Sequence, residues 1–170
     1  QVAVFQGDAT VAQELLAQPF NHIYYTGGYT VGALVMKAAA DHFASITLEM
    51  GGKSPVIIDK SANLDDTATK LAWGRVMNAG QVCIAPEYVI AHESVADALV
   101  EKLKVKMTEQ YNPNGDGFEN SENMNCIIND RHHQRIVGLI DDAVEKGATV
   151  AFGGNNFPES RIIEPTILTN

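Results

Sequence analysis

The chain has 170 residues, of which 45% are hydrophobic and 19% charged, and its formal net charge is −9 at pH 7. This length suits one ordinary domain or two incomplete ones, and the composition is typical of a globular rather than a disordered protein. The acidic balance argues against nucleic acid and anionic membranes as partners, and no run of about 18 apolar residues predicts a membrane span.

The first fifty residues predict strands that alternate with helices. We expect a short strand at 2–5, a helix at 11–17 and a buried strand at 22–25. Apolar residues at helical spacing predict a second helix, with an apolar face made of Val31, Leu34, Val35, Ala38 and Ala39. A strand at 45–48 completes a βαβ unit, and this places Glu49 at the carboxyl end of a parallel strand, where ligands bind in open α/β sheets.

A glycine turn, TGGYTVG at 26–32, connects the strand at 22–25 to the helix that follows. Backbone N–H groups are free at a helix N-terminus, where a phosphate can bind, and Gly27 and Gly28 allow a close approach. A tight connection between a strand and a helix needs the same glycines for its geometry alone, so both interpretations stay open. A P-loop at Gly52-Lys53-Ser54 is excluded, because its pattern requires a glycine where Thr47 stands.

The remaining residues predict a second α/β region. Its expected elements are strands at 56–59, 87–91, 148–151 and 161–168 and helices at 64–77, 93–109 and 131–146. We expect Asp130 to cap the last helix, His132 and His133 to be exposed on it, and Val105 to be buried on the helix at 93–109. The most plausible boundary between the two regions is Gly51-Gly52.

Two cysteines, Cys83 and Cys126, form no CxxC pair and no cluster with histidine, so a zinc site is not expected. Cys126 lies beside two isoleucines, and we expect it in the core. A reactive thiol needs a reducing compartment, and no signal peptide opens the chain, so a cytoplasmic location is predicted.

Two motifs hold the residues for covalent acyl chemistry, which needs a nucleophile and a base. LEMGGKSP at 48–55 presents Glu49 beside two glycines, and NAGQVCIAP at 78–86 presents Cys83 in a loop. Taken alone, such a cysteine is more often a small buried residue, and such a glutamate is more often a solvated strand end. We assign Asn78 and Gln81 to shaping the loop, and Lys53 to the surface or an ion pair.

In this order and at this separation, the two motifs resemble the glutamate and cysteine motifs of the NAD(P)-dependent aldehyde dehydrogenase superfamily. Met50 stands where leucine is usual. The segment 25–32 resembles the pyrophosphate loop of that family, with Gly28 in place of the usual serine. The resemblance implies an α/β fold, in which 1–50 is the C-terminal, βαβ part of a Rossmann-like dinucleotide-binding domain and 51–170 is the first part of the catalytic α/β domain.

The resemblance also implies a reaction: oxidation of an aldehyde to a carboxylic acid with NAD or NADP. Cys83 would be the nucleophile, and Glu49 would be the base that activates water to release the product. The cofactor-binding residues would be Thr26, Gly27, Gly28, Val31, Gly32, Met50 and Gly51. A homo-oligomer is expected, and the segment 24–27 most resembles the branch that acts on aromatic and fatty aldehydes.

Members of that family are several hundred residues long, so the chain resembles an internal segment that covers roughly the middle third. The asparagine that stabilises the oxyanion and the residues that bind the ribose groups would lie outside it. We therefore expect the isolated segment to have little or no turnover.

Three alternatives remain. The first is a relative that releases acyl-CoA or acts on semialdehydes, against which the presence of Glu49 argues. The second is a structural or interaction domain without catalysis, in which Cys83 would react no faster than Cys126. The third is another thiol enzyme, such as an acyltransferase, which would not explain the glycine turn ahead of a helix.

Overall fold

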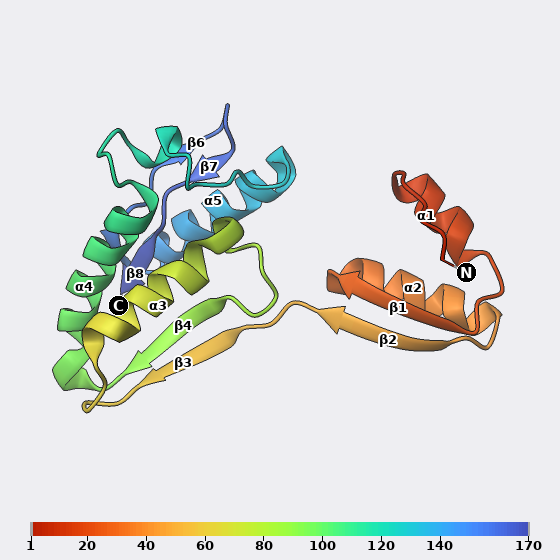
Figure 1. Ribbon diagram of the computed structural model, residues 1–170, viewed down its shortest axis with the longest axis horizontal. Coiled ribbons are helices and arrows are strands. Elements are labelled where there is room, and N and C mark those ends of the chain that lie inside the picture. Colours follow the sequence, from red (N-terminus) through yellow and green to blue (C-terminus); the bar gives the residue numbers. More distant parts are fainter. Residues whose placement is uncertain (1, 170) are drawn as a thin grey trace. The chain divides into compact units, whose positions relative to one another are not determined.

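The computed structural model describes residues 2–169 and divides the chain into two compact units, one up to Gly52 and the other from Lys53 onward (Figure 1). The boundary predicted between residues 50 and 51 lies two residues before this division. Each unit combines helices with paired strands, which agrees with the predicted α/β class.

The first unit contains α1 (Ala9–Leu16), β1 (His22–Gly27), α2 (Tyr29–Asp41) and β2 (Ser45–Met50). Strands β1 and β2 are parallel, and α2 connects them, as the βαβ prediction requires (Figure 1). Thr26 pairs with Glu49 and Gly27 with Met50, so these four residues lie at the carboxyl ends of the two strands.

Two predictions in this unit are wrong or only partly right. Residues 2–5 form no strand, and Val2 and Val4 are almost fully exposed, because no neighbouring strand offers hydrogen bonds to pair with. On α2, Val35 and Ala39 are buried as expected, whereas Val31 and Leu34 are about half exposed. The helix therefore covers the two strands along a narrower line than the sequence predicts.

The second unit opens with β3 (Ser54–Ile58), α3 (Leu64–Val76), the 3-10 turn η1 (Met77–Gly80), β4 (Pro86–Ala91) and α4 (Glu93–Tyr111). Strands β3 and β4 are parallel, so this is a second βαβ unit. The chain continues through η2 (Phe118–Asn120), α5 (Asp130–Glu145), β5 (Thr149–Phe152), β6 (Asn156–Phe157), β7 (Ile162–Ile163) and β8 (Ile167–Thr169). Strands β5 and β8 pair antiparallel, as do β6 and β7.

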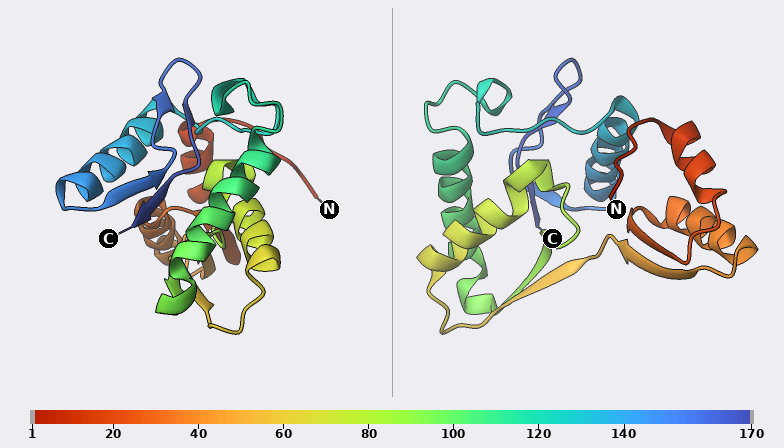
Figure 2. Two further views of the ribbon diagram at one scale, coloured as in Figure 1. Left: turned by 90° about the vertical axis from the view of Figure 1, so that its left-hand side faces the viewer. Right: turned by 45° about the vertical axis from the view of Figure 1, so that its right-hand side comes forward.

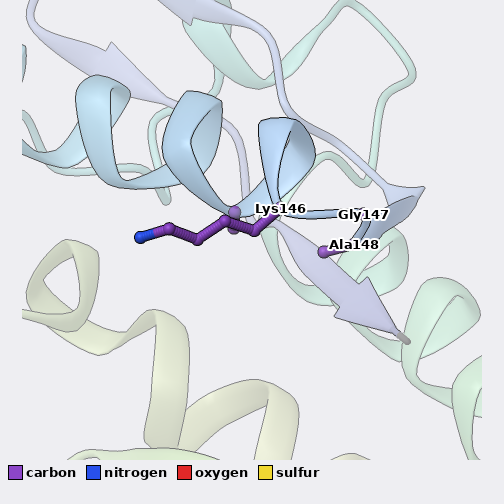
Figure 3. A pocket seen from close by; sticks show the side chains of 4 residues that line it. Lys146, Gly147 and Ala148 are labelled. Carbon is purple, nitrogen blue, oxygen red and sulfur yellow. The ribbon is translucent and has the colours of Figure 1, made fainter.

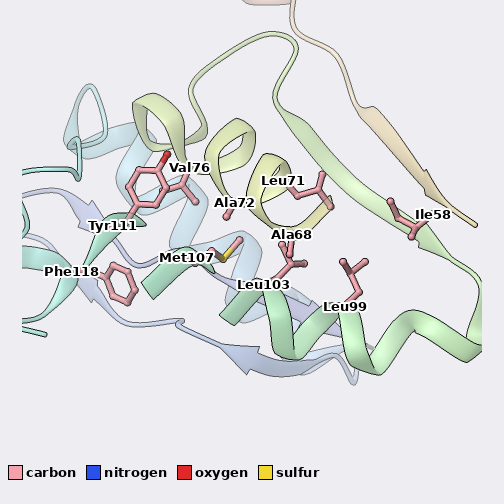
Figure 4. Packing of buried hydrophobic residues seen from close by; sticks show 10 residues of the cluster. All are labelled: Ile58, Ala68, Leu71, Ala72, Val76, Leu99, Leu103, Met107, Tyr111 and Phe118. Atoms are coloured by element: carbon pink, nitrogen blue, oxygen red, sulfur yellow. The ribbon is translucent and has the colours of Figure 1, made fainter. Parts of the chain in front are cut away.

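The core of the second unit lies where α3 packs against α4 (Figure 2). Its buried residues are Ile58, Ala68, Leu71, Ala72, Val76, Leu99, Leu103, Met107, Tyr111 and Phe118 (Figure 4). On α4 the buried positions recur every four residues from Leu99 to Tyr111. Val105 lies off this line and is 53% exposed, so the prediction that it is buried was wrong.

Helix α5 and the segment before it overturn three predictions. Asn129, not Asp130, caps α5, because its side-chain oxygen accepts a hydrogen bond from the N–H of His132 at 2.9 Å. His133 is buried at 3% exposure, since it shares a helix face with Ile136 and Val137. Cys126 is exposed, whereas its neighbour Ile127 is buried, so the backbone turns the isoleucine and not the thiol inward.

The strand predicted at 161–168 is broken into β7 and β8. Pro165 lies at the break, because it has no backbone N–H to donate to a neighbouring strand. Within residues 2–169, no helix is both long enough and apolar enough to cross a membrane.

Candidate active site

Cys83 lies at the second position of a tight turn between α3 and β4. The N–H of Ala85 donates to the carbonyl of Val82 at 3.0 Å, which closes the turn around Cys83 and Ile84. Both of these side chains are exposed, whereas Ala85 is buried at 5% exposure. The thiol is therefore accessible at the top of a turn whose far side is anchored in the second unit.

Three consecutive residues before this turn have left-handed backbone conformations. Asn78 and Ala79 have φ of 53° and 54°, and Gly80 has φ of 72°. A left-handed residue with a Cβ costs about 1–2 kcal/mol, so a run that includes Ala79 persists only where its surroundings fix it. A Cβ on Gly80 would also lie 3.1 Å from the carbonyl oxygen of Arg75, which explains why glycine stands there.

An ion-pair network supports the β4 end of the turn. Arg75 donates through Nη1 to the carbonyl of Pro86 at 3.4 Å and to Glu87 Oε2 at 3.0 Å. Lys53 Nζ lies 2.6 Å from Glu87 Oε1, so this lysine forms the ion pair considered from the sequence. Burial raises the pKa of Glu87, but the hydrogen bond from Lys53 and the positive charges of Arg75 and Lys53 outweigh it and lower that pKa overall.

Gln81 connects the turn to a segment that is distant in the sequence. Its Nε2 donates to the carbonyls of Asn78 and Cys126 at 3.0 and 3.2 Å, and its Oε1 accepts from the N–H of Ile128 at 2.9 Å. The predicted role of Gln81 in shaping the loop was right, but its partners at Cys126 and Ile128 could not be foreseen. A sequence gives no local signal for a contact across 45 residues.

Glu49 lies in the first unit, one residue before the end of β2, and is exposed. Its backbone pairs with Thr26, which is also exposed. Met50 follows, and Gly51 accepts a hydrogen bond from the hydroxyl of Tyr29 at 2.8 Å. Because Tyr29 begins α2, this bond ties the end of β2 to the start of that helix.

The N-terminus of α2 is suited to an anionic group such as the pyrophosphate of NAD(P). Gly28 is its N-cap residue, no side chain caps the helix, and the first turn holds no acidic residue. A Cβ on Gly28 would meet nothing within 4 Å, so the space on that side of Gly28 is open. Uncapped N–H groups at the positive end of a helix attract anions.

Gly32 and Val31 contribute differently from Gly28. The N–H of Gly32 donates to the carbonyl of Gly28 at 2.9 Å, and a Cβ on Gly32 would lie 3.0 Å from Met50 Sδ. Gly32 therefore lets α2 pack closely on β2, and it offers no free N–H group. Val31 lies in the first turn of the helix, with its side chain 49% exposed.

The predicted site residues fall into two groups. Thr26, Gly28, Glu49 and Gly51 lie together in the first unit, around the carboxyl ends of β1 and β2. Cys83 belongs to the second unit, as does Gln81, which was predicted to shape the loop. Three residues that the sequence did not assign to the site, Arg75, Glu87 and Arg161, make contacts with parts of the chain that are distant in the sequence.

A shallow hollow at the end of α5 is lined by Ala143, Lys146, Gly147 and Ala148, none of which is a predicted site residue (Figure 3). From Val2 to Thr169, no group of three or more His, Cys, Asp or Glu side chains is placed to hold a metal ion.

Several known proteins are similar to this chain over nearly its whole length. AldX of Bacillus subtilis (strain 168) is 46% identical over 175 aligned residues, which cover 100% of this chain and 38% of AldX. The dimeric NADP-preferring aldehyde dehydrogenase of Rattus norvegicus is 44% identical, over 98% of this chain and 35% of its own. The chain thus spans about a third of the length of the curated relatives that it matches.

Solved structures give the same answer. AldH of Staphylococcus aureus, solved in a substrate-bound state, matches with a TM-score of 0.84 at 36% identity, over 95% of this chain and 34% of its own. Residues 2–170 match the model of the aldehyde dehydrogenase family. The chain therefore belongs to the aldehyde dehydrogenase family.

Proposed function

We propose that this chain carries the nucleophile and the base of an enzyme that oxidises an aldehyde to a carboxylic acid with NAD or NADP. One observation carries the proposal: Cys83 is exposed at the second position of a tight turn that directly follows three left-handed residues and Gln81. A thiol on a fixed turn is placed for attack, and nearby backbone N–H groups can stabilise an oxyanion.

The first step belongs to Cys83. Its sulfur attacks the carbonyl carbon of the aldehyde and forms a thiohemiacetal, and the carbonyl oxygen takes up a proton. The chemistry that NAD(P)+ supplies when bound is acceptance of a hydride, which oxidises an aldehyde held on a thiol to the level of a thioester.

The last step belongs to Glu49. Its carboxylate takes a proton from water, and the water oxygen attacks the thioester carbonyl. The bond between carbon and sulfur breaks, the carboxylic acid leaves, and the Cys83 thiolate is restored. Glu49 is exposed at the carboxyl end of a parallel strand, which is where an open α/β sheet presents its functional groups.

The cofactor would be held by the first unit. The N–H groups at the start of α2 beside Gly28 would bind the pyrophosphate, with Thr26, Gly27, Val31, Met50 and Gly51 around it. Gly32 would contribute by allowing α2 to lie close to β2. Support for this choice comes from a relative, betaine aldehyde dehydrogenase of Staphylococcus aureus, which was solved with NAD+ and matches at 30% identity with a TM-score of 0.80.

The dimeric NADP-preferring relative supports NADP as well as NAD, and also a homo-oligomer. For the substrate we propose an aromatic or fatty aldehyde. Benzaldehyde and hexanal are suitable probes, with NAD+ and NADP+ compared for each.

The test uses two forms of the protein. In the 170-residue chain, p-nitrophenyl acetate should acetylate Cys83 with release of p-nitrophenolate, and Cys83→Ser should abolish this burst. The thiol of Cys126 is also exposed and serves as the internal control, because peptide mass spectrometry shows which cysteine carries the acetyl group. A burst that survives Cys83→Ser would place the nucleophile elsewhere.

In the full-length protein, benzaldehyde or hexanal should reduce NAD+ or NADP+ and yield the carboxylic acid, with or without added CoA. Formation of acyl-CoA would instead favour a CoA-acylating relative. Equal acetylation of Cys83 and Cys126, together with no reduction of either cofactor, would favour a domain without catalysis.

A further inference from the structure

The turn that carries Cys83 needs an external support. Asn78, Ala79 and Gly80 are all left-handed, a conformation that most residues avoid. The hydrogen bond from the N–H of Gln81 to the carbonyl of Asn78 at 3.1 Å lies within the residues that lead into the turn, so it cannot fix their position against the rest of the unit.

The side chain of Gln81 provides this support. Its amide group donates twice through Nε2, once locally to the carbonyl of Asn78 and once to the distant carbonyl of Cys126, and it accepts once through Oε1 from the N–H of Ile128. The amide thus bonds as one peptide group of a neighbouring strand would, because it pairs with the carbonyl of Cys126 and the N–H of Ile128 in one short segment.

The segment that receives Gln81 is itself fixed on its other edge. Between Cys126 and Ile128 lies Ile127, which is buried at 2% exposure. Its N–H donates to the carbonyl of Arg161 at 2.9 Å, and its carbonyl accepts from Arg161 Nε at 3.0 Å. Backbone groups therefore alternate, with those of Cys126 and Ile128 directed to Gln81 and those of Ile127 directed to Arg161.

We propose that Gln81 is a positioning residue for the Cys83 thiol, and that Arg161 acts through it by holding the segment 126–128 in place. The clamp is the set of hydrogen bonds that joins Gln81, segment 126–128 and Arg161. This inference rests on the proposed role of Cys83 as nucleophile and adds the residues that fix its position.

Only glutamine suits this position. Glutamate has the same shape but no N–H group, so Gln81→Glu would place a carboxylate against the carbonyls of Asn78 and Cys126, which both accept hydrogen bonds. Gln81→Ala removes the clamp without adding repulsion. On the other edge, Arg161→Lys keeps the charge but has no Nε–H group to donate to Ile127.

Gln110 offers a matched control. Its Nε2 donates to the carbonyl of Thr69 at 3.1 Å, and its Oε1 is buried without a partner among the described residues. Gln110→Glu therefore makes the same chemical change on α4, at a position that does not contact the Cys83 turn.

The first experiment measures the clamp without any catalysis. Hydrogen exchange of the Ile128 amide in the 170-residue chain should be at least tenfold faster in Gln81→Ala and in Gln81→Glu than in the unmodified chain. In Gln110→Glu, the exchange rate of the Ile128 amide should rise by no more than the loss of global stability accounts for. Unchanged exchange at Ile128 in both Gln81 variants would overturn the proposal.

The second experiment measures positioning through the p-nitrophenyl acetate burst. The burst amplitude reports the fraction of molecules that fold, and the rate constant reports how well the thiol is placed in those molecules. We expect Gln81→Glu to lower the rate constant at least tenfold with the amplitude retained, and Gln110→Glu to lower only the amplitude. If the rate constant fell equally in Gln81→Glu and Gln110→Glu, Gln81 would have only a structural role, and the proposal would be overturned.

Arg161→Lys completes the design. If Arg161 acts through the clamp, the rate constant in the double variant with Gln81→Glu should be close to that in Gln81→Glu alone. Multiplied effects would contradict the proposed role of Arg161. If the unmodified chain shows no burst that depends on Cys83, the proposed function fails. The exchange rate of the Ile128 amide then still tests whether the hydrogen bonds of the clamp form.

Discussion

Glu49 is the residue whose chemistry can be tested most directly after Cys83. It is exposed at the end of β2, where it is free to act on a water molecule. Glu49→Gln keeps the shape of the side chain and removes the base.

We predict that Glu49→Gln slows hydrolysis of the acyl-enzyme by about 10²-fold or more, which is the usual contribution of a general base. Formation of the acyl-enzyme should change little, because Glu49 is not assigned to that step. Burst kinetics in the full-length protein separate the two phases, with Glu14→Gln as the control on the exposed surface of the first unit. An equal loss in both phases would remove Glu49 from the hydrolysis step.

His133 gives a prediction about stability. It is buried at 3% exposure, and its Nε2 has no hydrogen-bond partner among the described residues. A buried polar atom without a partner costs about 1–3 kcal/mol. His133→Leu should therefore raise the free energy of unfolding by about 1 kcal/mol, as measured by urea denaturation at pH 7. His132→Leu, at the half-exposed neighbour, should change it by less than about 0.5 kcal/mol; a clear loss of stability in His133→Leu would reveal a partner for the imidazole.

At the scale of elements, the ion pairs of Glu87 join α3, β4 and the start of β3 beside the Cys83 turn. Arg75 comes from α3 and Lys53 directly precedes β3. Both charges favour the ionised form of Glu87, which is why its folded-state pKa lies below the ordinary value of 4.5. The pairs therefore stabilise the fold only while Glu87 is ionised.

The lowered pKa of Glu87 predicts how the free energy of unfolding depends on pH. The folded pKa of Glu87 is lowered, so its contribution is fully present above pH 4.5 and is lost as the pH falls through the folded pKa. We predict that the difference in unfolding free energy between the unmodified chain and Glu87→Gln is constant at neutral pH and shrinks below pH 4.5.

Urea denaturation over a series of pH values tests this prediction. Lys53→Met should show a weaker pH dependence than the unmodified chain but not lose it, because Arg75 still pairs with Glu87. A difference that grows on acidification would mean that burial, and not the two cations, dominates at Glu87.

At the scale of the whole molecule, the two units differ in how much core they contain. In the first unit the buried residues are Gly32, Val35 and Ala39, and its sheet has two strands. The second unit holds the ten-residue cluster between α3 and α4. An isolated two-stranded sheet with little core is marginally stable in water.

We therefore predict that amides of β1 and β2 exchange with solvent at least ~100-fold faster than amides of α3 and α4 in the 170-residue chain. Hydrogen exchange followed by mass spectrometry measures both in one sample, so the second unit is the control for the first. Equal protection would show that the chain unfolds as a single cooperative body.

The sequence by itself determined the elements and the family. The periodicity of apolar residues predicted the first βαβ unit and the helices and strands of a second α/β region, since spacing along the chain indicates which face of a helix or strand is buried. The motifs at 48–55 and 78–86 are the basis for proposing Glu49 and Cys83 as catalytic residues, because each motif is a local pattern that the sequence shows directly. The caps and exposures that were wrong, at Asn129, Cys126 and His133, depend on small rotations of the backbone that local composition does not encode.

Only the tertiary structure decided what supports the reactive turn. Gln81 meets Cys126 and Ile128 across 45 and 47 residues, and Arg161 meets Ile127 across 34. On the side of segment 126–128 these hydrogen bonds use backbone groups, which every residue has. The residue types at positions 126–128 therefore do not predict them. The left-handed backbone at Asn78 and Ala79 was likewise not predicted, because residues other than glycine rarely adopt it and no local pattern here requires it.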